Sequence, residues 1–124
     1  MNQLDFTGRH AVVTGGATGL GYAIAQRLLA SGGSVTLWDR DATAAEAAAK
    51  TLGAAAHWVQ VDVADHGSVV HALQATLQQV PAGIDALVNS AGVTGPNTKL
   101  WDYPIDAWRQ VLDVNLTGLF LCCR

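Results

Sequence analysis

The sequence predicts an α/β fold in which a parallel sheet carries helices on both faces. Short apolar runs alternate with longer segments of helical periodicity along the whole chain of 124 residues, and this alternation is typical of linked β-α-β units. The runs "AVVT" and "ALVN" have no polar face, as strands covered on both sides require. Half of the residues are apolar, so we expect one domain, residues 1–124, with its own core.

The first half of the chain is expected to form two strands and two helices. "HAVVT" at 10–14 is short and apolar, which favours a buried strand. The segment 19–33 has apolar residues at helical spacing and closes on two glycines. A second strand is expected at 34–39, and an alanine-rich helix at 41–53, where Gly53 would end it.

The second half continues the alternation. A third strand is expected at 56–62, and Asp65 is a favourable N-cap for a helix over 66–80, which stops before a proline. A fourth strand within 85–92 is expected to run into a loop at 93–104. The remaining segment, 105–123, reads as helical throughout.

Composition excludes several classes of function. The net charge is −3 and no block of basic residues occurs, which argues against nucleic-acid binding. No apolar run is long enough to span a membrane and no signal-peptide pattern begins the chain, so a cytoplasmic protein is expected. The adjacent Cys122 and Cys123 suggest small apolar residues on a buried helix rather than a disulfide. No metal is expected, because the four histidines, at 10, 57, 66 and 71, lack a shared ligand spacing.

The stretch "TGGATGLG" at 14–21 concentrates glycines between the first strand and the first helix. The first turn of a helix offers unpaired N–H groups and a positive dipole end, a ready site for a dinucleotide pyrophosphate. Gly15 would permit the turn, Gly19 would let the phosphate approach the backbone, and Gly21 would permit close packing of the helix. The spacing is neither G-x-G-x-x-G nor a P-loop, which needs a lysine that is absent here. A ligand-free glycine turn is the alternative.

Several motifs in order resemble the short-chain dehydrogenase/reductase family, in its branch with compact subunits. They are "TGGATGLG" at 14–21, "WDR" at 38–40, "VDV" at 61–63, "NSAG" at 89–92 and "DVNLTG" at 113–118, and the resemblance covers all 124 residues. It implies a Rossmann-type, doubly wound parallel sheet, here truncated after about four strands. It also implies hydride transfer between a nicotinamide cofactor and an alcohol or ketone of small size.

Asp39 bears on the choice of cofactor. It ends the second strand 18 residues beyond Gly21, where a carboxylate can accept hydrogen bonds from the adenosine ribose and would repel a 2′-phosphate. No basic residue stands at positions 17 or 18. Arg40, however, could reach toward a 2′-phosphate. NAD is therefore favoured over NADP.

The resemblance assigns further residues of this sequence to the cofactor. Asp62 and Val63 would meet the adenine, and Thr18 and Leu20 the ribose and phosphates. Asn89 would stabilise the central strand and contact the ribose. Ser90 stands where the family more commonly has a second asparagine. Two small residues would lie close to the cofactor, and one asparagine would disturb a helix so that its main chain holds a water of the proton relay: Ala91, Gly92 and Asn115.

The rest of the family's catalytic group is not found in these residues. A tyrosine, a lysine four places later and a serine are expected of the family, but Tyr22 and Tyr103 have no such lysine partner. We expect a fragment of a longer enzyme, inactive alone, because the sequence stops within an apolar run; a genuine short, catalytically inactive dinucleotide-binding or regulatory module is the alternative. The exposed apolar residues near the end also suggest a homo-oligomer.

Overall fold

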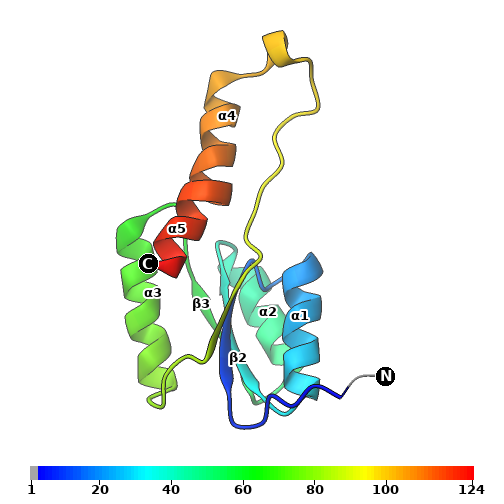
Figure 1. Ribbon diagram of the computed structural model, residues 1–124, viewed down its shortest axis with the longest axis vertical. Helices are drawn as coiled ribbons and strands as arrows, with labels where there is room; N and C mark the ends of the chain where they lie inside the picture. Colours follow the sequence, from blue (N-terminus) through cyan, green and yellow to red (C-terminus); the bar gives the residue numbers. More distant parts are fainter. Residues whose placement is uncertain (1–2) are drawn as a thin grey trace.

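A four-stranded parallel sheet lies at the centre of the molecule, as described for residues 3–124 by a computed structural model (Figure 1). Its spatial order is β3-β2-β1-β4, and every neighbouring pair is parallel. The chain therefore leaves β1 toward one side for β2 and β3, then returns to the other side for β4. The strands are β1 (His10–Thr14), β2 (Ser34–Asp39), β3 (Ala56–Gln60) and β4 (Ala86–Asn89).

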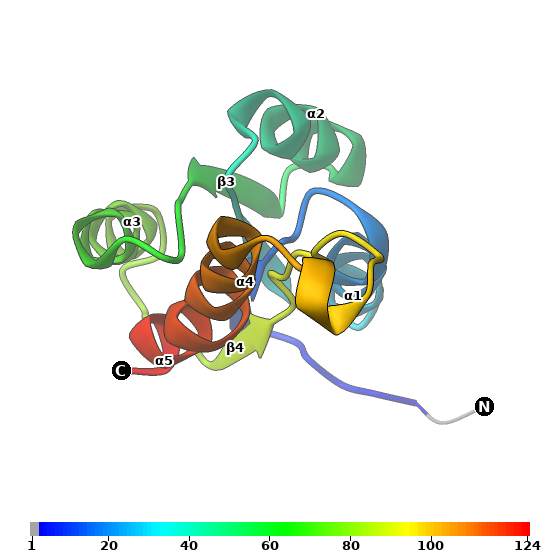
Figure 2. The same ribbon diagram turned by 90° about the horizontal axis from the view of Figure 1, so that it is seen from above.

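Helices cover both faces of this sheet (Figure 2). One face carries α1 (Gly19–Ala30) and α2 (Ala42–Leu52), and the other carries α3 (His66–Gln79) and α5 (Gly118–Cys123). This arrangement is the doubly wound, Rossmann-type architecture expected from the sequence.

Neighbouring residues of β1 point into two separate cores. Ala11 and Val13 pack with the buried alanines of α1 and α2, whereas Val12 packs with Val69 and other residues on the α3 face. All three β1 side chains are at most 1% exposed. Burying a valine contributes about 1.5–3 kcal/mol, so "AVVT" is apolar throughout because both faces of the strand exclude water.

Two strands end earlier than the sequence suggested. After β3, the Val61 amide still donates to the Asp39 carbonyl (2.9 Å), but the Asp62 amide donates to the Ser68 hydroxyl instead (2.9 Å). After β4, the amides of Ser90 and Ala91 both donate to a β1 hydroxyl rather than to a strand. In each case a side-chain oxygen takes over the backbone donor and turns the chain out of the sheet.

The C-terminal segment is not one continuous α-helix. It consists of α4 (Ile105–Leu112), a π-helical turn (Asp113–Thr117) and α5, and a short 3₁₀ turn (Leu100–Asp102) precedes it. Helix α4 projects beyond the sheet, beside the long loop that rises from β4 (Figure 1). Single π turns inside helices are frequent at functional sites.

The two cysteines differ from each other. Cys122 is partly buried, and burial together with the neighbouring Cys123 raises the pKa of its thiol to about 11, so it is a protonated, unreactive thiol. Cys123 is exposed. The expectation that both cysteines are buried was therefore wrong for Cys123, which is the last residue of α5 and lies exposed beside the Asn89 side chain at the end of β4.

His10 is a buried polar residue at the start of β1, only 2% exposed. Its Nδ1 lies 2.6 Å from the Ser34 hydroxyl and its Nε2 lies 2.7 Å from the Thr36 hydroxyl. Its backbone amide donates to the carboxylate of Asp85 (2.8 Å). Burial, and to a smaller extent the nearby His57, lower the pKa of His10, while Asp85 opposes this change.

This lowered pKa predicts acid sensitivity of the fold. The unfolded chain binds a proton at His10 more readily than the folded chain, so the stabilisation is present above the ordinary histidine pKa of about 6.5 and is lost as pH falls through the folded value. We expect the free energy of unfolding to fall on acidification, by at most about 1.4 kcal/mol per pH unit from this group. Urea titrations at several pH values should show that the free energy of unfolding changes less steeply with pH in His10→Gln than in the unmodified chain. An equally steep change in the two proteins would contradict the assignment.

Candidate functional site

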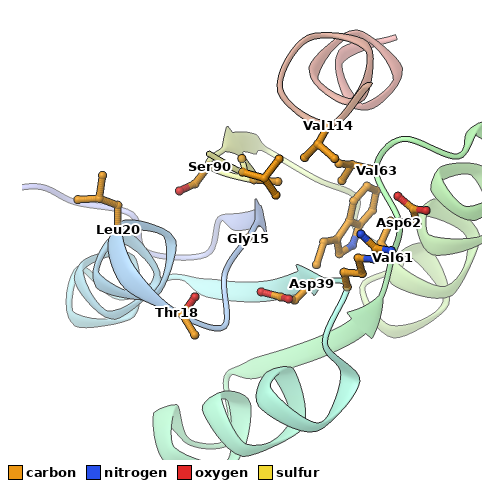
Figure 3. A pocket seen from close by; sticks show the side chains of 14 residues that line it. Gly15, Thr18, Leu20, Asp39, Val61, Asp62, Val63, Ser90 and Val114 are labelled. Atoms are coloured by element: carbon orange, nitrogen blue, oxygen red, sulfur yellow. The ribbon is translucent and has the colours of Figure 1, made fainter. Parts of the chain in front are cut away.

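A cleft of about 380 Å³ opens at the carboxyl ends of the strands. Its lining residues stand at or after the ends of all four strands. It therefore includes the point between β1 and β4 where the strand order reverses, and such switch points are the usual ligand sites of open α/β sheets. Figure 3 shows Thr18 and Asp39 on one side of it, and Asp62 and Val63 on the other. Its walls consist of Gly15, Thr18, Leu20, Trp38, Asp39, Arg40, Val61, Asp62, Val63, Ser90, Ala91, Gly92, Val93 and Val114.

The three glycines of the corner have different roles. Gly15 (φ +63°) turns the chain, and a Cβ there would lie 2.9 Å from Ala91 Cα. A Cβ on Gly21 would overlap the carbonyl oxygen of Gly15, so glycine at this position allows the first turn of α1 to pack against the loop that precedes it. Gly19 (φ +59°) differs, because a Cβ there would meet no atom within 4 Å. The backbone at the start of α1 is thus open to a ligand.

Thr14 connects the two strands that flank the cleft. Its hydroxyl accepts hydrogen bonds from the amides of Ser90 (3.1 Å) and Ala91 (3.0 Å). It thereby fixes the loop that forms the cleft wall after β4. No role was predicted for Thr14, although a polar residue that ends a buried strand just before a glycine turn is a usable signal.

Asp39 holds the glycine corner as well as facing the cleft. Its Oδ2 accepts from the Ala17 amide (3.1 Å) and its Oδ1 from the Asp41 amide (3.0 Å). Each carboxylate oxygen has a second lone pair, so both can still accept a ligand hydroxyl. Arg40 also lines the cleft, and its carbonyl accepts a bond from the Gln60 side chain (3.2 Å).

Asp62 and Val63 form the opposite wall. The Asp62 amide is held by Ser68, and its Oδ1 accepts from the Ala64 amide (3.1 Å). These bonds fix a tight turn between β3 and α3 and leave Asp62 partly exposed toward the cleft. The turn after β3 is therefore a hydrogen-bonded edge of the cleft that carries one carboxylate, that of Asp62.

Asn115 lies in the π-helical turn and clamps the loop after β4. Its Oδ1 accepts from the Val93 amide (2.8 Å) and its Nδ2 donates to the Val93 carbonyl (2.9 Å). Asn89 does not line the large cleft. It faces a smaller cavity of about 140 Å³ together with Asn115, and its Nδ2 lies 3.4 Å from the sulfur of Cys123.

The structure brings most of the predicted site residues together. Gly19 and Gly21 shape the corner without lining the cleft, and Asn89 and Asn115 line the adjoining cavity. Nine predicted residues line the cleft itself: Gly15, Thr18, Leu20, Asp39, Arg40, Asp62, Val63, Ala91 and Gly92. The apolar members of the wall were not predicted, because their positions in expected strands, in the loop 93–104 and in the last helix carried no sign of a ligand site: Trp38, Val61, Val93 and Val114.

Among the described residues 3–124, no group of three or more potential ligand side chains is placed to hold a metal ion. None of the helices in this range has the length and apolar character needed to cross a bilayer.

The fold and the cleft define a Rossmann-type nucleotide-binding domain. The chain belongs to the short chain dehydrogenase family, whose sequence profile matches residues 9–124. One relative, a 2-dehydro-3-deoxy-L-rhamnonate dehydrogenase (NAD(+)) from Sphingomonas, is 42% identical over 96% of this chain. A 2-(R)-hydroxypropyl-CoM dehydrogenase from Xanthobacter autotrophicus is also 42% identical, over 94% of the chain. The chain covers 47% and 48% of these proteins, so it spans about half the length of the curated relatives it matches.

Solved structures show the same relationship. A 3-ketoacyl-(acyl-carrier-protein) reductase from Brucella melitensis, complexed with NADH, matches with a TM-score of 0.93 and 30% identity over 97% of this chain and 49% of its own. RhlG from Pseudomonas aeruginosa, in an NADP complex, matches with a TM-score of 0.87 and 36% identity over 98% of this chain and 48% of its own. The chain is homologous to NAD(P)-dependent oxidoreductases, and both NAD and NADP occur among these relatives.

Proposed function

We propose that this chain is the NAD-binding part of an oxidoreductase that transfers a hydride between nicotinamide and a small alcohol or ketone. The observation that carries the proposal is the cleft, whose walls include Gly15 of the glycine corner and the carboxylate of Asp39 at the end of β2. The open Gly19 stands in the chain between Thr18 and Leu20, which both line the cleft. A diphosphate would lie at the Gly19 backbone, and the adenosine ribose would bond Asp39. The adenine would lie toward Asp62 and Val63, and the nicotinamide toward Gly92.

The cleft fits this cofactor on its own geometry. The space that a Cβ would occupy at Gly19 is empty, so phosphate oxygens can reach the backbone there. Asp39 retains free lone pairs for two hydroxyls and would repel a 2′-phosphate, since like charges close together are unfavourable. When bound, NAD supplies the hydride chemistry, and the protein's residues bind and orient it.

The carboxylate at Asp39 predicts a preference for NADH over NADPH of at least about tenfold, which corresponds to about 1.4 kcal/mol. Asp39→Ala should narrow this ratio by weakening NADH binding and removing the repulsion of the 2′-phosphate. Calorimetric titration of each cofactor into the purified chain measures both affinities.

Asp41→Ala is the matched control for this experiment. Asp41 is also a carboxylate near the cleft, but it caps α2 by accepting from the Ala44 amide (3.0 Å) and does not line the cleft. Its removal should leave the cofactor ratio unchanged. Tighter binding of NADPH by the unmodified chain would overturn the preference and point to Arg40 as the residue that contacts the 2′-phosphate.

Asn115 would serve the proton relay through the π-helical turn. A π turn displaces backbone carbonyls from regular hydrogen bonding, and the adjoining cavity of about 140 Å³ beside Asn115 could hold a water. The side chain itself is occupied by Val93, so the main chain would hold the water.

A catalytically inactive dinucleotide-binding module is the second candidate function. It is favoured by the cleft walls, which contain no tyrosine or lysine among residues 3–124. A Tyr-x-x-x-Lys segment in the coding sequence of the parent protein would decide for the enzyme, and NAD binding without such a segment would decide for the module.

We also propose that the parent protein is a homo-oligomer. Large apolar side chains are exposed along α4, the π-helical turn and α5, among them Trp108 (55%), Leu116 (61%) and Phe120 (61%). Exposed apolar area of this extent favours association. Light scattering of the full-length parent protein should give a mass above that of its monomer, and a monomer at all concentrations would contradict the proposal.

A further inference from the structure

Trp38 is the one aromatic side chain among the cleft residues of the described range, and its indole is hydrogen-bonded to a residue that does not line the cleft. Its side chain is 3% exposed and lines the cleft. Its Nε1 donates to the hydroxyl of Thr76 on α3 (2.9 Å). That hydroxyl is completely buried and donates in turn to the carbonyl of Ala72 (2.8 Å).

The direction of this chain of hydrogen bonds is fixed. The Thr76 hydroxyl has one proton, which the Ala72 carbonyl accepts, so the Thr76 oxygen is left as an acceptor. An indole N–H can only donate. The two groups therefore match in one orientation, and the plane of the Trp38 ring is set from α3 rather than from the cleft.

The ring lies at the end of the cleft that we assign to adenine. Trp38 directly precedes Asp39, and it packs in one buried cluster with Val61 and Val63, the neighbours of Asp62. All of these residues line the cleft, whereas Thr76 does not. An apolar ring in the part of the cleft wall that also holds Asp39 and Asp62 would give a flat base a surface without a competing charge.

We propose that Trp38 is the floor of the adenine end of the cleft, and that Thr76 is a positioning residue that holds this floor through the indole N–H. The proposal rests on the proposed function, since it assumes that an adenine dinucleotide occupies the cleft. Without the Thr76 hydroxyl, the indole N–H would be buried and unpaired, a state that is unfavourable enough to turn the ring or admit water.

The test compares binding of NADH and of AMP by calorimetric titration. Thr76→Val keeps the size of the side chain and removes the hydroxyl, and it should weaken both ligands by about tenfold. Thr76→Ser keeps the hydroxyl and should restore binding. In a Trp38→Phe background, which has no indole N–H, Thr76→Val should produce no further loss, because the two residues act as one unit.

Thr51→Val is the matched control. Thr51 makes the same type of bond in α2, to the carbonyl four residues earlier (3.0 Å), but it is exposed and holds no indole. It should bind both ligands as the unmodified chain does. If Thr76→Val fails to fold, Trp38→Phe alone decides: weaker AMP binding supports the proposal, and equal binding overturns it.

The outcomes separate this inference from the proposed function. Binding of NADH and AMP by the unmodified chain, with the same affinities in Thr76→Val, overturns the role of Thr76 and leaves the proposed function intact. A loss in Thr76→Val that persists in the Trp38→Phe background also overturns it, because the effect would not pass through the indole. If the unmodified chain binds neither ligand, the proposed function fails and this inference fails with it.

Discussion

Replacement of Gly19 with valine is expected to weaken NADH binding by at least about a hundredfold, or about 2.7 kcal/mol, without disrupting the sheet. Gly19 has a φ of +59° and open space where a Cβ would point. A β-branched residue is strained at this φ, and its methyl groups would fill the space that the diphosphate needs. Because no protein atom lies within 4 Å, the core is not affected. Calorimetric titration measures the binding, and circular dichroism the fold.

Substitutions at two other glycines distinguish the effect of backbone strain from steric exclusion of the diphosphate. Gly8 has a φ of +74° and equally open surroundings, but it precedes β1 at the opposite end of the sheet. Gly8→Val should therefore cost stability and leave NADH binding unchanged. Gly21→Ala would overlap the Gly15 carbonyl, so it should deform the corner itself. Normal NADH binding by Gly19→Val would show that the corner is a turn without a phosphate site.

The elements and the glycine corner could be predicted because their causes are local. Apolar runs and helical spacing reflect burial on one or two faces, and the positive φ values of Gly15 and Gly19 require glycine whatever the rest of the chain does. The strand ends could not be predicted. They depend on the hydroxyls of Thr14 and Ser68, and Thr14 is more than 70 residues from the amides it binds.

The C-terminal helix shows a second limit. An α-helix and a single π turn have nearly the same apolar pattern, so 105–123 reads as continuous. Only the family resemblance indicated a disturbance at Asn115, and the structure places Asn115 within the π-helical turn. The position of Asn89 beside the smaller cavity, and of Trp38 in the cleft wall, depended on how the strands twist and on what α3 and α5 place against them.

The chain of 124 residues is expected to bind NAD without oxidising any alcohol. Hydride transfer to NAD needs a base that takes the proton from the substrate hydroxyl, and in this family's pattern a tyrosine paired with a lysine does so. Tyr22 packs against the core of α1 and α2, and the Tyr103 hydroxyl lies against Gly95 in the loop after β4. Neither lines the cleft, so no phenol is available there.

The lack of a phenol at the cleft alone should lower the rate by about a hundred- to ten-thousand-fold. The measurement is NADH formation, followed by absorbance, with a chain of confirmed mass and a series of simple alcohols. NADH binding by the same sample is the control, because it shows that the chain is folded and that the cleft is open. NADH formation that is lost in Gly19→Val would contradict the prediction, since it would require a catalytic base among the residues that already surround the cleft.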